Sequence, residues 1–225
     1  MTLSSVRRGP ANPADIVLGG YVLSVPTPRK HWQDDDFVPD TFLTISRCLL
    51  KGLPHPEFWD WYTDRSAAEA DRTRSAPSAS LLAVGLVNSD VQLFKDDHSP
   101  SSGALPGPDR DTEFPTSLDL LCTGRPLPRD AELIGFDVVG VDYGISLFHS
   151  WLCHSYEAEV WKDLRIRLDP TGLLVSYEDA ARVLAWIESR PTEQAPEPVP
   201  WTVVAIATCG TSRPDGRTTQ AGRHN

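Results

Sequence analysis

The residues best suited to chemistry lie in one short run, His149-Ser150-Trp151-Leu152-Cys153-His154. A thiol beside an imidazole can support covalent catalysis, because the histidine lowers the pKa of the cysteine and accepts its proton. Neighbours in a chain usually point their side chains in different directions, however, and catalytic Cys and His normally meet across a fold. Two interpretations are therefore open: a structural Cys153 on the apolar side of a helix, or a catalytic group of Cys153, His149 and His154.

The same run also contains possible metal ligands. His149 and Cys153 are four residues apart, and His154 and Glu157 are three apart, so either pair would share one face of a helix. A tetrahedral zinc site would need further ligands from elsewhere in the chain, such as His31, His55 or His98. The sequence offers no recognisable second half of such a site. We therefore predict no metal and no cofactor.

Three acidic clusters stand out: Asp34-Asp35-Asp36, Asp96-Asp97-His98 and Asp109–Asp111. None has the glycine-punctuated ligand order of a calcium loop. Each can be a solvated loop, but clustered charge also accelerates association with a cationic partner. We take Asp34, Asp35 and Asp36 as candidate partner-binding residues.

The charge balance narrows the possible partners. The chain has 31 acidic and 21 basic residues, a formal charge of −10 and a pI near 5.0. A nucleic acid or an anionic bilayer would repel such a protein unless its basic residues clustered, and in this sequence they are scattered. We expect a protein partner, basic in charge, with no nucleic acid and no membrane. The oligomeric state is not predicted.

Cysteine usage and the termini indicate a compartment. The four cysteines, Cys48, Cys122, Cys153 and Cys209, form no C-x-x-C pair, and their density is far below that of a disulfide scaffold. No segment reaches the roughly 18 apolar residues that a membrane span requires, and no apolar stretch follows the arginines near the N-terminus. We expect reduced thiols in the cytoplasm.

Hydrophobic periodicity predicts the elements. Strands are expected at 16–25, 41–50, 80–87, 90–95, 132–141, 145–150, 164–168 and 201–208, with a possible bulge at Gly19-Gly20 and a hairpin turn at Asn88-Ser89. Helices are expected at 57–74, from Ser150 to Leu164, and between Ser176 and Pro191, where Ser176 begins a capping box. Strict βαβ alternation is missing. The predicted fold is α+β: a mainly antiparallel sheet with about three helices packed on it.

The predicted organisation is a single α+β domain at 14–208 between two disordered tails, 1–13 and 209–225. The C-terminal tail is too poor in apolar residues to offset the entropy of ordering its backbone. Residues 96–115, rich in Asp, Ser, Gly and Pro, are expected to form a mobile loop.

Residues 127–190 contain LPRDAELIGFDVV, DYGISLFHSWLC and RLDPTGLL, followed by a short helix. This part resembles uncharacterised and immunity-like proteins from toxin–immunity loci of high-GC bacteria. The resemblance implies a non-enzymatic cytoplasmic protein that acts by binding, and it carries over no catalytic residue. We therefore expect an acidic binding protein, in its specific form an immunity-type protein that neutralises a basic toxin domain. The alternative is a small enzyme with a Cys/His or metal centre around His149–His154.

Overall fold

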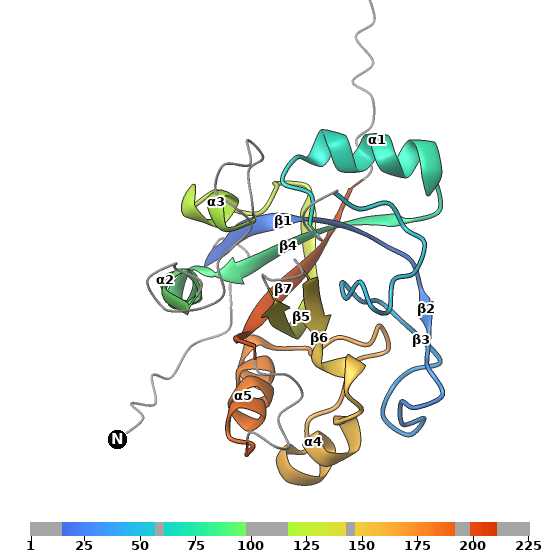
Figure 1. Cartoon of the computed structure of the whole chain (residues 1–225), viewed down its shortest axis with the longest axis vertical. Coiled ribbons are helices and arrows are strands. Elements are labelled where there is room, and N and C mark those ends of the chain that lie inside the picture. Colours follow the sequence, from blue (N-terminus) through green and yellow to red (C-terminus); the bar gives the residue numbers. More distant parts are fainter. Residues whose placement is uncertain (1–14, 57–60, 98–116, 143–146, 192–198, 211–225) are drawn as a thin grey trace, which may run out of the picture.

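The computed structural model describes residues 15–56, 61–97, 117–142, 147–191 and 199–210. Its centre is a curled five-stranded antiparallel sheet in the order β1-β4-β7-β5-β6 (Figure 1). The strands are β1 (Ile16–Ser24), β4 (Ser80–Val87), β5 (Ala131–Asp142), β6 (Leu147–Ser150) and β7 (Trp201–Cys209). Two short strands, β2 (Thr27–Pro28) and β3 (Thr41–Phe42), pair separately. The expected α+β class with a mainly antiparallel sheet is confirmed.

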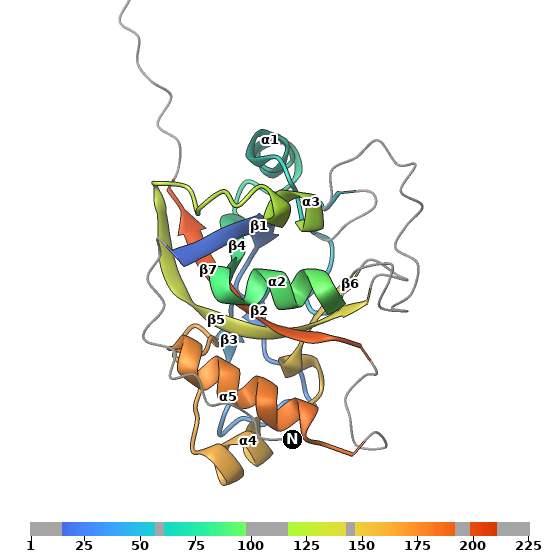
Figure 2. The ribbon, with the colours of Figure 1, turned by 90° about the vertical axis from the view of Figure 1, so that its left-hand side faces the viewer.

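Helices cover both faces of this sheet. They are α1 (Arg65–Ser75), α2 (Asn88–Asp97), α3 (Ser117–Cys122), the 3-10 turn η3 (Trp151–Cys153), α4 (Glu157–Leu164) and α5 (Tyr177–Glu188). Figure 2 shows α4 and α5 below the sheet, and α1 and α3 above it. Alternate strand residues enter two apolar clusters, so Val138 packs with α5 whereas Val139 packs with Trp61 and Phe148. Because both faces are buried, β1 and β7 consist almost wholly of buried residues.

Local sequence signals account for several elements. The register of β1 against β4 shifts between Leu18 and Gly20, which confirms the bulge expected at the glycine pair. A Cβ on Gly20 would lie 2.8 Å from Cβ of Trp61, so only glycine lets the chain at Trp61 pack this closely. Helix α5 begins as expected, since the Ser176 side chain accepts a hydrogen bond from the backbone N–H of Asp179.

The strand expected at 41–50 is wrong beyond Phe42. The Thr44 hydroxyl accepts a hydrogen bond from the N–H of Ser46 at 3.0 Å, and the Ser46 carbonyl accepts from the N–H groups of Leu49 and Leu50. Such local side-chain and turn bonds take the backbone groups that a strand ladder would need. The chain therefore turns at 46–50, and this turn carries Cys48.

The hairpin expected at Asn88-Ser89 is also wrong, because residues 88–97 form α2. Strand β4 already has β1 on one side and β7 on the other, so no edge is left for a hairpin partner. Val91 and Phe94, three residues apart, are instead buried on one face of the helix.

Two helices differ from their expected bounds. The first begins at Arg65, because the Asp64 side chain caps it by accepting from the N–H groups of Ser66 and Ala67. Residues 57–60 of that prediction lie outside the described residues.

The helix expected from Ser150 to Leu164 is broken into η3 and α4 by Ser155, whose φ is +59°. The strand expected at 164–168 is wrong, since α4 ends there on Arg165 with φ +61°.

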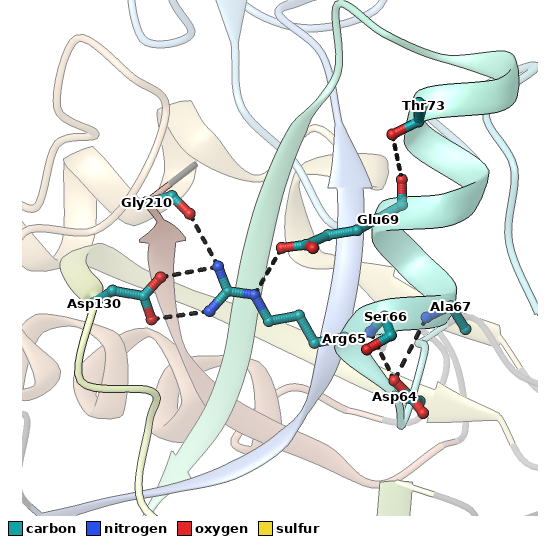
Figure 3. Close-up of polar contacts among 8 residues, drawn as sticks. All are labelled: Asp64, Arg65, Ser66, Ala67, Glu69, Thr73, Asp130 and Gly210. Carbon is teal, nitrogen blue, oxygen red and sulfur yellow. Dashed lines mark hydrogen bonds and ion pairs between the residues drawn. The ribbon is translucent and has the colours of Figure 1, made fainter. Parts of the chain in front are cut away.

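One polar cluster ties α1 to the ends of two strands. Figure 3 shows the Arg65 guanidinium donating two hydrogen bonds to the Asp130 carboxylate, at 2.9 and 2.8 Å, and others to Glu69 and the Gly210 carbonyl. Asp130 immediately precedes β5, and Gly210 immediately follows β7. This bidentate contact locks the helix onto the sheet.

The chain termini and the expected mobile loop are described only in part. The N-terminal tail at 1–13 and residues 98–115 of the loop lie outside the described residues. Cys209, the first residue of the expected C-terminal tail, belongs to β7, and 211–225 are again outside. None of the described helices is long and apolar enough to cross a membrane.

Candidate thiol site

Two cysteines from distant parts of the chain meet at one edge of the sheet. Cys48 lies on the turn after β3, and Cys153 is the last residue of η3, which directly follows β6. Their Sγ atoms are 2.6 Å apart, and both are free thiols. A disulfide bond is about 2.05 Å long, so a small closing movement would join them. Cys48 is exposed, whereas Cys153 is half-buried.

The Ser46 hydroxyl holds the two thiols together. Its Oγ lies 2.9 Å from Cys48 Sγ and 3.2 Å from Cys153 Sγ, within hydrogen-bond distance of both. Ser46 is fully buried, and its backbone N–H is bonded to Thr44, whose carbonyl in turn accepts from Ser24 at the end of β1. The turn is thus anchored to the sheet, which fixes the position of Cys48.

The two thiols differ in acidity. The hydrogen bond from Cys153 lowers the pKa of Cys48, and hydrogen bonds from His149 and Ser46 lower it further, against the opposing effect of burial. The same contact acts in the other direction on Cys153, since its proton is held by the Cys48 thiolate, and burial adds to the increase in its pKa. The greater exposure of Cys48 and the opposite directions of the two pKa shifts favour Cys48 as the thiolate and Cys153 as the protonated partner.

A buried carboxylate lies behind the pair. Asp137 on β5 is 3% exposed, and its Oδ1 accepts hydrogen bonds from the Val138 N–H at 2.8 Å and from Ser150 Oγ at 3.0 Å. Burial raises the pKa of Asp137 to about 7, and the negative charge of Cys48 contributes to this increase. Ser150 also accepts from the N–H of Leu152, so one hydroxyl connects Asp137 to the start of η3.

The structure separates the residues of the predicted Cys/His group. Cys153 and His149 both belong to the thiol site, His149 through its hydrogen bond to Cys48. His154 packs among aromatic rings instead, with centroid distances of 6.2 Å to Tyr156 and 5.9 Å to Trp201. Cys153 also packs against the apolar core that contains Leu152, as does Tyr156.

Sequence reasoning missed Cys48, Ser46 and Asp137. Cys48 was one of only three possible thiol partners for Cys153, but it was placed inside an expected strand. Asp137 sits within the run ELIGFDVVGV, where a charged residue among apolar neighbours was a signal that could have been used. Neither signal shows that Cys48 and Asp137 belong to the same site. Their positions relative to Cys153 depend on how β5, β6 and the turn at 46–50 pack together.

The geometry of the site favours thiol chemistry over metal binding. Within the part of the chain that the structure describes, the only three potential ligands whose donor atoms all lie within 4.8 Å of one another are Asp34, Asp35 and Asp36. Cys48, Cys153 and His149 do not meet that condition, so they do not form a prearranged three-ligand centre. The Asp34–Asp36 cluster is mostly exposed, as expected for a solvated loop.

The acidic loop is nevertheless attached to the thiol site. The Gln33 amide donates a hydrogen bond of 2.9 Å to the Leu152 carbonyl of η3, and the Ser155 hydroxyl donates one of 2.8 Å to the Trp32 carbonyl. Two bonds therefore connect the loop that begins with Trp32 to the residues on either side of Cys153.

Comparison of the chain with protein-family models, with curated proteins and with solved structures gave no match.

Proposed function

We propose that the protein carries out thiol–disulfide exchange, with Cys48 as the attacking thiolate and Cys153 as the resolving thiol. The observation that carries this proposal is the Sγ–Sγ contact of 2.6 Å between an exposed cysteine of lowered pKa and a half-buried cysteine of raised pKa. The thiolate is the nucleophile in exchange, so the exposed, acidic member of a pair attacks first.

The reaction balances with a disulfide as the other reactant. The Cys48 thiolate attacks one sulfur of the substrate disulfide; a Cys48 Sγ–S bond forms, the substrate S–S bond breaks, and the first substrate thiol leaves as a thiolate that takes a proton from solvent. Cys153 then loses its proton and attacks Cys48 Sγ. The Cys48–Cys153 disulfide forms and the second substrate thiolate leaves. The substrate gains two electrons, and the protein loses two.

The neighbouring groups suit these steps. Hydrogen bonds from His149 and Ser46 stabilise the Cys48 thiolate before it attacks the substrate disulfide. A reducing dithiol would regenerate the pair for a further cycle. The proposal agrees with a reducing compartment such as the cytoplasm, where the resting pair would be the free thiols seen in the structure.

Alkylation at low pH tests the thiolate assignment. Reduced protein is treated with iodoacetamide at pH 5.5, and the modified cysteines are identified by peptide mass spectrometry. We expect Cys48 to be modified at least tenfold faster than Cys122, an exposed cysteine at the end of α3 that serves as the internal control. Equal rates at the two cysteines would refute the assignment.

An aromatic disulfide, dithiobis-nitrobenzoate, tests the exchange itself. The variant C122A/C209A, which keeps only Cys48 and Cys153, is expected to release two equivalents of thionitrobenzoate and to end as an intramolecular disulfide. Adding C153S should stop the reaction after one equivalent, with the label on Cys48. An unlinked pair carrying two labels in the first variant would contradict a resolving role for Cys153.

A second candidate function remains the acidic binding protein, in its specific form an immunity-type protein for a basic toxin domain. The observation in its favour is an exposed Trp32, 47% accessible, beside Asp34, Asp35 and Asp36 on a loop anchored to η3. Exposed tryptophan next to clustered charge is typical of protein interfaces.

Affinity capture from the source cells tests this candidate with two baits, the unchanged chain and D34N/D35N/D36N. Support requires a basic protein that the first bait retains at low salt and that the triple variant loses. Identical captures by both baits would refute a role for the cluster.

A further inference from the structure

We infer that Asp137 is the proton acceptor of the resolving step: it takes up the Cys153 proton as Cys153 attacks the mixed disulfide on Cys48. This inference rests on the proposed thiol–disulfide exchange and assigns a role to the one group of that site which the exchange itself leaves unexplained. Resolution needs such a group, because a half-buried thiol that has lost its thiolate partner must still be deprotonated before it can attack.

The position of Asp137 supports this role. It is almost fully buried on β5, where Val139, two residues further on, pairs with Ser150 of β6. The Ser150 hydroxyl donates to Asp137 Oδ1 and caps η3, the short helix whose last residue is Cys153. Strand pairing and the cap therefore hold the carboxylate and the resolving thiol in one rigid unit.

The hydrogen bonds of Asp137 leave one oxygen for the proton. Both hydrogen bonds that the described residues make to this carboxylate fall on Oδ1, from Val138 N–H and Ser150 Oγ. No hydrogen bond joins Asp137 to Cys153 among the described residues, so the proposed transfer requires a water molecule between the Cys153 thiol and Asp137 Oδ2.

Burial is the main cause of the raised pKa of Asp137, and nearby charged groups modify it. Cys48 and Cys153 both interact electrostatically with it, and His149 lies on the neighbouring strand and bonds to Cys48. On β7 its register partner is Val204, which carries no charge. A carboxyl with a pKa near 7 is a far better proton acceptor at neutral pH than an ordinary aspartate.

The proton balance closes over one cycle. Ionised Asp137 accepts the Cys153 proton while the Cys153–Cys48 bond forms and the second substrate thiolate leaves. Cys48 loses its charge when the mixed disulfide forms and remains uncharged in the Cys48–Cys153 disulfide, so its repulsion with Asp137 is absent until the pair is reduced. The carboxyl then releases its proton to solvent, and the site is ready for reduction.

Stopped-flow measurement of thionitrobenzoate release between pH 5 and 9 separates the two steps. The first equivalent reports attack by Cys48, and the second reports resolution by Cys153. We expect D137N to slow the second phase at pH 7 at least tenfold more than it changes the first phase. Its second phase should then rise with pH up to 9, whereas the second phase of the unchanged chain is expected to reach a plateau above pH 7.

E157Q is the matched control. Glu157 on α4 is also buried, and burial likewise raises its pKa to about 7, but it is not among the groups that act on either thiol. Its variant should keep both phases of the unchanged chain. A D137N second phase with the rate and pH profile of E157Q overturns the inference, whereas absence of the first phase in the unchanged chain refutes the proposed exchange instead.

A measurement on the unchanged chain covers the case in which D137N fails to fold. The Asp137 side-chain carboxyl is titrated by carbon NMR in the reduced and in the disulfide form. We expect the midpoint of Asp137 to be near 7 in the reduced form and lower in the disulfide form, with the midpoint of Glu157 equal in both forms. Equal Asp137 midpoints would show that the carboxyl does not respond to the thiols, and would overturn the inference.

Discussion

Cys48 and Cys153 are 105 residues apart in the chain, yet their Sγ atoms lie 2.6 Å apart over a single buried serine hydroxyl. The contact joins a turn that follows β3 to a 3-10 turn that follows β6, so it connects the small two-stranded sheet to the edge of the large one. Oxidation of this pair would close a long loop across the fold.

Disulfide formation is therefore expected to stabilise the protein. In the chain-entropy description, a cross-link that closes a loop of about 100 residues adds about 4–5 kcal/mol to the free energy of unfolding. The measurement is urea unfolding of the unchanged chain in its reduced and oxidised forms. C48S should show the same unfolding midpoint under both conditions. A lower midpoint for the oxidised unchanged chain would mean that closing the pair distorts the turn at 46–50.

Replacing His149 by Gln should weaken the nucleophile. The imidazole lowers the pKa of Cys48 through a hydrogen bond and through its charge, so its loss raises that pKa. The fraction of thiolate present at low pH then falls. We expect the iodoacetamide rate of Cys48 at pH 5.5 to drop several-fold in H149Q and to recover at pH 9. The control is H154Q, because His154 packs on aromatic rings away from the thiol pair; equal losses in both variants would contradict the assignment.

Asp137 should make the protein less stable as the pH rises. Its pKa is about 7 in the folded state, above the ordinary value of 3.8, so the folded state binds more protons than the unfolded state between these values. The free energy of unfolding therefore falls over this window, by an amount on the order of 2–4 kcal/mol. The lowered pKa of Cys48 acts in the opposite sense, since it favours the folded state as the pH rises.

The effect of Asp137 is isolated by comparing the unchanged chain with D137N at pH 4.5 and pH 8. We expect D137N to gain stability relative to the unchanged chain at the higher pH. If the difference in the free energy of unfolding between the two proteins is the same at pH 4.5 and pH 8, Asp137 is ionised in the folded state at both pH values.

The strands with long β-branched runs could be predicted from the sequence. IVLGGYVLSV, ELIGFDVVGV and WTVVAIAT form β1, β5 and β7 within one or two residues of their expected ends. Continuous apolar runs rich in β-branched residues mark these elements because the strands are buried on both faces. The Ser176 cap of α5 was equally local and equally predictable.

Elements that depend on hydrogen bonds between side chain and backbone, or on neighbours in space, could not be predicted. The run TFLTISRCLL alternates like a strand, but the Thr44 hydroxyl and the Ser46 carbonyl turn the chain back. Asn88-Ser89 resembles a hairpin turn, but β4 has strands on both sides. The thiol site combines both difficulties, because Cys48 lies on that turn and meets Cys153 only through tertiary packing.

The final prediction concerns the contact between α1 and the sheet. Arg65 donates two hydrogen bonds to Asp130, and further ones to Glu69 and to the Gly210 carbonyl; its side chain is 21% exposed and that of Asp130 is 45% exposed. Exposed ion pairs are typically worth less than 1 kcal/mol, but a bidentate pair with a further carbonyl contact is stronger. We expect R65A to lower the free energy of unfolding by about 1–2 kcal/mol.

R65K separates geometry from charge, because lysine keeps the positive charge but cannot form the two parallel hydrogen bonds to Asp130. The R65K variant should recover less than half of the free energy of unfolding that R65A loses. The control is R74A: Arg74 also pairs with an aspartate, Asp71, but its side chain is 74% exposed and the pair lies within α1. A loss in R74A as large as that in R65A would show that the helix charges, rather than the connection from Arg65 to the ends of β5 and β7, stabilise this part of the protein.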